Sequence, residues 1–169
     1  MLANNNPRDI ILQTMNIFVV SYDPVTAAKE LCDKHVVKMI AESAQMLCCA
    51  YPDGEAPYKR AYYNHPCTVW ARETMGNFDW LTDHALALCS EYTCRYGRIH
   101  KSEEVITWCR DNIRKLEFSG WNLTPFPQAM PDEYKDKDCA VTAYRAYYNA
   151  EKASFAKWSK SEKPDWFVS

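Results

Sequence analysis

The chain has 169 residues, 47% of them hydrophobic and 25% charged, which suits one folded domain with a sizeable core and excludes whole-chain disorder. Its net charge is −2 and its pI is about 6.1, which argues against a protein that coats nucleic acid through charge alone. Only 4 glycines occur, all isolated, so a Gly-rich phosphate-binding loop is excluded. No apolar run is long enough to cross a bilayer, and we expect no membrane-spanning helix.

The chain begins with a polar stretch, residues 1–14, which we interpret as a leader before a single helical domain over residues 15–169. Residues 16–21 form the one extended run, and it ends at Asp23-Pro24, a typical helix start. Helical periodicity then predicts helices over about 24–50, 57–63, 66–96, 102–118 and 139–159. Residues 121–138 contain three prolines and are predicted to form a long ordered loop. The expected fold is all-α, a single compact bundle of four to five helices with at most one short N-terminal strand.

Eight cysteines occur without a CxxC pair, and most fall at apolar helical positions, where a reduced thiol behaves as a small hydrophobe. The start of the chain has neither the basic nor the apolar part of a secretion signal. We therefore expect buried free thiols and a cytoplasmic protein. The histidines are too scattered for a metal site, so we predict neither a metal nor a cofactor; they are His35, His65, His84 and His100.

Three polar side chains, His35, Lys38 and Glu42, share one edge of the first predicted helix, and we call them the helical column. On a helical wheel Lys38 and Glu42 fall roughly 60° and 20° from His35, beside an apolar stripe. A carboxylate at such an edge is partly desolvated, which raises its pKa as a general acid/base requires. A neighbouring amine or imidazole can position it or stabilise developing charge. The same spacing also fits an ordinary i,i+4 ion pair beside a boundary histidine.

The stretch Glu30-Leu31-Cys32-Asp33-Lys34-His35, followed by Glu42, resembles the first helix of the phage-type pyrimidine-dimer DNA glycosylases, the endonuclease V type of phage T4. Further short matches extend over most of residues 16–167: His65-Pro66, Leu88-Cys89-Ser90-Glu91-Tyr92 and the aromatic tail Pro164-Asp165-Trp166-Phe167. The resemblance implies that fold for the helical domain, Glu42 as the catalytic acid/base and His35 on the face that contacts DNA. It also implies the cytoplasm of a bacterial or phage-infected cell.

The chain differs from that family at its nucleophile and in its charge. The family uses the α-amino group of a threonine exposed by removal of the initiator Met, but no Thr follows Met1 or Met15. A start at Met15 with Met removal would expose the amine of Asn16, a residue whose size disfavours that removal. Ala41 replaces the arginine that precedes the family's catalytic glutamate, and this chain is slightly acidic where family members are basic.

Without the threonine amine, two mechanisms are open. Glu42 activates a water for hydrolysis, or an amine such as Lys38 attacks C1′ of the sugar and forms a Schiff base. His35 and Lys38 would place the sugar or phosphate.

The expected DNA-binding or nucleotide-binding residues are polar side chains in or beside apolar stretches: His65, Arg72, Arg95, His100, Lys101 and Trp166. For Arg95, a buried ion pair with Glu91 on the same helix face is the competing interpretation.

The sequence thus predicts a DNA base-processing enzyme that cleaves an N-glycosidic bond with Glu42 as acid/base. One alternative is an enzyme acting at the N-glycosidic bond of a free nucleotide, which suits the near-neutral pI. The other is a non-catalytic module that binds a nucleotide or a protein on the same fold. The sequence indicates no particular oligomeric state.

Overall fold

The computed structural model describes residues 15–169, so the expected leader over residues 1–14 lies outside the described residues. Within that range the chain forms six α-helices: α2 (Pro24–Glu30), α3 (Asp33–Cys48), α4 (Pro66–Glu73), α5 (Met75–Tyr96), α6 (Glu103–Asp111) and α7 (Ala140–Glu151). Two 3₁₀ turns, η1 (Ile113–Lys115) and η2 (Asp132–Tyr134), complete the regular structure, and no strand occurs in residues 15–169. The all-α fold class is confirmed.

The two longest predicted helices are each broken into two. The predicted helix over 24–50 divides because Leu31 and Cys32 are extended, and the carbonyl groups freed at the break bond to the Arg95 guanidinium of α5. The predicted helix over 66–96 divides at Thr74, whose hydroxyl caps α5 by accepting the N–H of Asn77 at 3.1 Å. Each break is stabilised by groups from other parts of the chain that bond to the free helix ends. The local pattern of apolar residues therefore does not mark the break.

The remaining predicted helices are shorter or absent. Residues 57–63 do not form a helix, and Tyr62 among them has a φ of +50°, which no helical residue adopts. The helix expected over 102–118 ends at Asp111 before η1. The last helix ends at Glu151, earlier than expected, because the following residues bond to the break between α2 and α3. Lys157 O there accepts the N–H of Asp33 at 2.8 Å.

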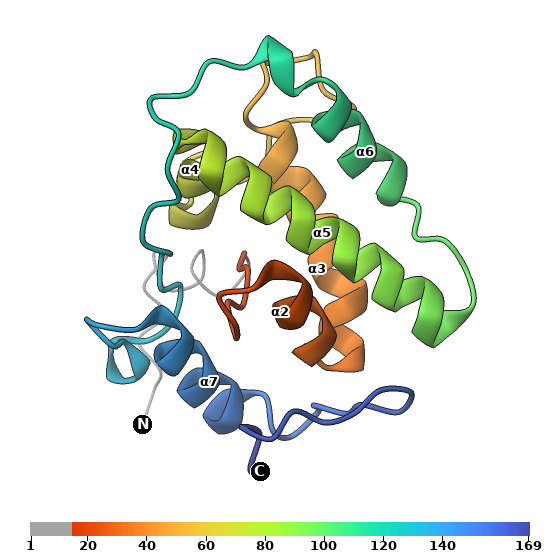
Figure 1. Ribbon diagram of the computed structural model, residues 1–169, viewed down its shortest axis with the longest axis vertical. Helices are drawn as coiled ribbons and strands as arrows, with labels where there is room; N and C mark the ends of the chain where they lie inside the picture. The colour runs from red at the N-terminus through yellow and green to blue at the C-terminus, as the bar shows by residue number, and fades with distance from the viewer. Residues whose placement is uncertain (1–14) are drawn as a thin grey trace, which may run out of the picture.

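The longest helix, α5, packs against α2, α3, α4 and α6. In Figure 1, α7 and the C-terminal tail lie at the opposite end of the molecule from α6, with α2 drawn between α5 and α7. The extended segment after residue 15 runs into this end of the bundle, and its side chains Val19 and Val20 are fully buried. The N-terminal segment, α3 and α7 therefore share one part of the core.

All eight cysteines are free thiols, and six of them are buried. In the part of the chain that the structure describes, no helix is both long enough and apolar enough to span a membrane.

Candidate active site

Glu42 lies near the middle of α3 and is almost fully buried, with 7% of its surface exposed. Its Oε1 atom is 3.3 Å from Lys38 Nζ, and its Oε2 atom accepts the main-chain N–H of Asn16 at 3.1 Å. Burial raises the pKa of Glu42, whereas the Lys38 charge and the Asn16 N–H act in the opposite direction. A carboxyl group whose pKa is raised toward neutrality can both accept and release a proton at working pH.

His35, two turns earlier on α3, is enclosed by aromatic rings and is 5% exposed. It stacks on Phe18 with ring centroids 4.4 Å apart, and Tyr148 and Phe155 meet it edge-on at 5.2 and 5.5 Å. Phe18 has a φ of +58°, a left-handed conformation that is strained for a side chain of this size. The strained turn places the Phe18 ring against His35.

His35 is neutral at physiological pH. Burial lowers its pKa to about 3, and the charges of Lys152 and Lys38 add to the effect. Its Nδ1 atom is buried and has no hydrogen-bond partner within residues 15–169. His35 is therefore suited to hydrogen bonding and packing, and is not a cation at working pH.

Lys152, at the C-terminal end of α7, belongs to the same site and was missed by the sequence reasoning. Its amine lies 4.7 Å from the Tyr147 ring centroid and 5.7 Å from that of Phe18. With Lys38 it gives the surroundings of His35 two positive charges. No sequence spacing connects Lys152 with the helical column, because the two lie at opposite ends of the chain.

Asn16 was also missed as a part of the site. Its side-chain Oδ1 accepts the N–H groups of Ile17 and Phe18 at 2.8 and 3.3 Å, and its Nδ2 donates to Ala129 O at 2.8 Å. These bonds fix the residue in the orientation that points its main-chain N–H at Glu42. The extended run over 16–21 was the available signal, but nothing in it indicates this partner.

The structure brings the helical column together on one helix, but five of the other six predicted site residues bond elsewhere among the described residues, and the sixth, Lys101, is exposed. His65 caps α4 by accepting the N–H of Cys67 at 3.1 Å, and burial lowers its pKa. Arg72 donates to Tyr63 O at 2.6 Å and lies over the Tyr63 ring, 3.7 Å from its centroid.

Of the remaining three accessible candidates, two bond within the fold and one is exposed. His100 accepts the N–H of Ser102 at 3.1 Å, Lys101 is exposed, and Trp166 donates its indole N–H to Glu30 at 2.9 Å. None of these contacts involves the helical column.

Arg95, a predicted DNA-binding or nucleotide-binding residue, lies inside the fold in this structure. It is 2% exposed, and its guanidinium bonds to the carbonyl groups of Lys29 and Leu31 and to the carboxylates of Asp33 and Glu91. These contacts occupy its N–H donors inside the protein, so Arg95 holds α2, α3 and α5 together. The competing interpretation, a buried ion pair with Glu91, describes it correctly.

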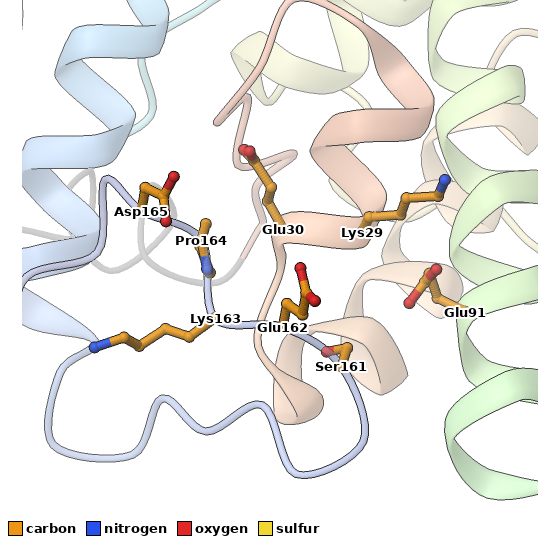
Figure 2. Close-up of a pocket in the computed structure, with 8 residues that line it drawn as sticks. All are labelled: Lys29, Glu30, Glu91, Ser161, Glu162, Lys163, Pro164 and Asp165. Carbon is orange, nitrogen blue, oxygen red and sulfur yellow. The ribbon is translucent and has the colours of Figure 1, made fainter.

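A separate cavity of about 400 Å³ lies between α2, α5 and the C-terminal tail (Figure 2). Its lining carries both signs of charge, and two of its carboxylates already have partners: Glu30 bonds to Trp166 and Glu91 to Arg95. Figure 2 shows the Lys163 amine turned away from the Glu91 side of the cavity. This cavity holds no group of the helical column, and two of its carboxylates, Glu30 and Glu91, are bonded within the fold.

No group of three or more His, Cys, Asp or Glu side chains that could hold a metal ion occurs between residues 15 and 169.

A family model for pyrimidine dimer DNA glycosylases matches residues 15–104. No curated protein and no solved structure matches the chain. The matched segment covers over half of the residues and runs from the extended segment through α5, so it contains Asn16 and the whole helical column. This chain belongs to the pyrimidine dimer DNA glycosylase family.

Proposed function

We propose that this protein is a DNA N-glycosylase that releases a damaged or modified pyrimidine, with Glu42 as its acid/base. The observation that carries the proposal is the setting of the Glu42 carboxyl, buried between the Lys38 amine and the Asn16 N–H, with a pKa raised by burial. Family membership supplies the reaction class. An ordinary ion pair on the protein surface would leave the Glu42 carboxyl exposed to solvent, whereas here it is buried.

The target nucleotide must leave the base stack before a carboxyl group can assist departure of its base. In the proposal, Lys38 and Lys152 attract the phosphates on either side of the flipped nucleotide, and the neutral His35 contacts the sugar. The two ammonium groups beside the imidazole can each attract one of the two phosphates that flank the nucleotide.

The attacking group in this proposal is a water molecule. The nitrogen that Glu42 holds is the main-chain nitrogen of Asn16, which carries an amide bond to Met15 and has its lone pair delocalised. The Lys38 amine is engaged in an ion pair with Glu42 at 3.3 Å, which opposes its use as a nucleophile. Glu42 takes the proton from water as the oxygen bonds to C1′, and the electron pair of the broken C1′–N bond leaves with the base. The departing base then receives that proton from Glu42, which returns the carboxylate to its starting state.

Glu42→Gln tests the acid/base role. We expect cleavage of duplex oligonucleotides that carry pyrimidine dimers or modified pyrimidines to fall by about 10²–10⁴-fold, the usual contribution of a positioned acid/base. The matched control is Glu104→Gln, which changes an exposed glutamate on α6 and is expected to leave the rate unchanged. Near wild-type turnover by Glu42→Gln would reduce Glu42 to an ion-pair residue and refute the proposed chemistry.

Sodium borohydride trapping during the same reaction distinguishes the attacking group. The water route leaves no covalent protein–DNA adduct, whereas attack by an amine leaves a reducible Schiff base. An adduct lost in Lys38→Arg would identify Lys38 as the nucleophile and overturn the water route, while the role of Glu42 would stand.

A further inference from the structure

Tyr144, on α7, is fully buried, and its hydroxyl group lies where the two ends of the chain meet. The hydroxyl oxygen is 2.9 Å from Asn16 Oδ1, 2.9 Å from Pro127 O, and accepts the N–H of Ala129 at 3.2 Å. Burial raises the pKa of Tyr144 well above its ordinary value, so the hydroxyl keeps its proton and remains a donor. It thus contacts the loop before α7 and the N-terminal segment at once.

The carboxamide of Asn16 is held from both sides by this arrangement. The Tyr144 hydroxyl shares its one proton between Oδ1 of this carboxamide and Pro127 O, both at 2.9 Å. The carbonyl oxygen of Ala129, whose N–H donates to Tyr144, accepts from the Nδ2 atom at 2.8 Å. The main-chain nitrogen of the same residue reaches Glu42. A connection therefore runs from the Tyr144 hydroxyl on α7, through the side chain and the main-chain N–H of Asn16, to the Glu42 carboxylate on α3.

Glu42 has few other polar neighbours that could orient it. Lys38 faces it from its own helix and has a side chain that is 57% exposed, so this contact is free to move. The Cys67 thiol faces it from α4, and burial raises the pKa of that thiol to about 12, so it carries no charge. The Asn16 N–H is the one fixed donor on Glu42 among these groups.

We propose that Tyr144 is a positioning residue, which orients Glu42 by holding Asn16 in place. It touches neither the carboxylate nor the reacting atoms. The inference rests on the proposed function for its effect on catalysis, but its effect on Glu42 itself is measurable without any substrate. The family model ends at residue 104, so Tyr144 lies outside the matched segment.

Tyr144→Phe tests the inference because it removes one oxygen atom and keeps the ring, which packs edge-on against Phe18 at 6.1 Å. Titration of the Glu42 carboxyl by ¹³C NMR should show its pKa rising by about half a unit or more, since the loosened Asn16 N–H no longer favours the charged form. In the glycosylase assay we expect kcat to fall about tenfold and the acidic limb of the pH profile to move with the carboxyl pKa, while KM changes less than about twofold.

The matched control is Tyr51→Phe. Tyr51 is equally buried, and its hydroxyl donates to Cys109 O, away from Asn16. We expect a similar loss of thermal stability with no change in the Glu42 titration or the pH profile. An unchanged Glu42 pKa in Tyr144→Phe would overturn the inference, whatever happens to the rate.

Asn16→Ala breaks the same connection from its other side and is the second variant should Tyr144→Phe fail to fold. It is expected to raise the Glu42 pKa in the same direction, and an unchanged pKa would again refute the inference. If Glu42→Gln proves fully active but Tyr144→Phe still moves the Glu42 titration, the proposed function fails and the positioning role survives. The two ideas are therefore separable.

Discussion

Glu42 and His35 lie on one helix, and burial favours the neutral form of both, raising the pKa of the acid and lowering that of the base. The two pKa shifts make the free energy of unfolding depend on pH in opposite directions. The folded state binds the Glu42 proton more tightly than the unfolded chain, so this contribution is lost as pH rises through the folded pKa. The folded state binds the His35 proton more weakly, so its contribution is lost as pH falls below the unfolded value of 6.5 toward about 3.

His35→Gln should therefore flatten the acid side of the stability curve. In the wild type, protonation of this histidine in the unfolded chain lowers the free energy of unfolding by up to about 1.4 kcal/mol for each pH unit below 6.5. The glutamine variant lacks this dependence, and urea unfolding at several values between pH 4.5 and 7 measures the difference. His100→Gln is the comparison, because His100 is only half-buried and burial therefore lowers its pKa less than that of His35. Parallel curves for wild type and His35→Gln would show that the imidazole is solvated.

At the scale of elements, the break between α4 and α5 is held by a segment from the second half of the chain. Thr74 donates its hydroxyl to Asn122 O at 2.8 Å, and the N–H groups of Met75 and Gly76 bond to Gly120 O and Trp121 O. The free N-terminal donors of α5 thus find partners in residues 119–124. This contact holds the N-terminal end of α5 against residues 119–124.

Gly76→Ala should disrupt that contact. A Cβ atom at this position would lie 2.5 Å from Leu123 N and 2.7 Å from Asn122 C, both main-chain atoms. We expect a loss of about 2–3 kcal/mol in the free energy of unfolding, although glycine-to-alanine changes inside helices ordinarily stabilise. Gly120→Ala is the control, because its Cβ would meet only the Thr74 Cγ2 atom at an ordinary 3.5 Å. Equal stability of the two variants, measured by thermal unfolding, would contradict the close packing.

At the scale of the whole molecule, a net charge of −2 means that DNA binding depends on local groups of positive charge. Lys38 and Lys152 form one such group beside His35. Arg60 and Arg72 form another, with both guanidinium groups over the Tyr63 ring. We expect a protein of this net charge to contact few phosphates.

Duplex binding should therefore weaken with salt, but less steeply than for a basic DNA-binding protein. Each phosphate neutralised contributes about −0.9 to the slope of log K against log salt concentration, so Lys152→Gln should make the slope less negative by about 0.9. Lys115→Gln, which changes an exposed lysine on η1, should leave the slope unchanged. Fluorescence anisotropy with a labelled duplex measures both. A slope near zero in the wild type would favour a free nucleotide as the ligand.

The sequence predicts the helical fold and the helical column because both follow from a period of 3.6 residues along a continuous segment. It does not predict the breaks at Leu31 and Thr74, because Arg95 and residues 119–124 stabilise them from far along the chain. Asn16 and Tyr144 escape prediction for the same reason, since a hydrogen bond between residues so distant in sequence leaves no periodic pattern. The part of the site that lies on one helix was predictable, and the part assembled from three segments was not.

The bond between Tyr144 and Asn16 also fixes the order of events during synthesis, because its partners are separated by 128 positions in the sequence. A ribosome that adds about 5–20 residues per second needs on the order of ten seconds to travel from one to the other. During this interval the nascent chain contains Glu42 and Asn16 but not yet Tyr144, whose hydroxyl holds Asn16 in place. The carboxylate becomes part of a finished site only when α7 emerges and packs against the extended segment after residue 15.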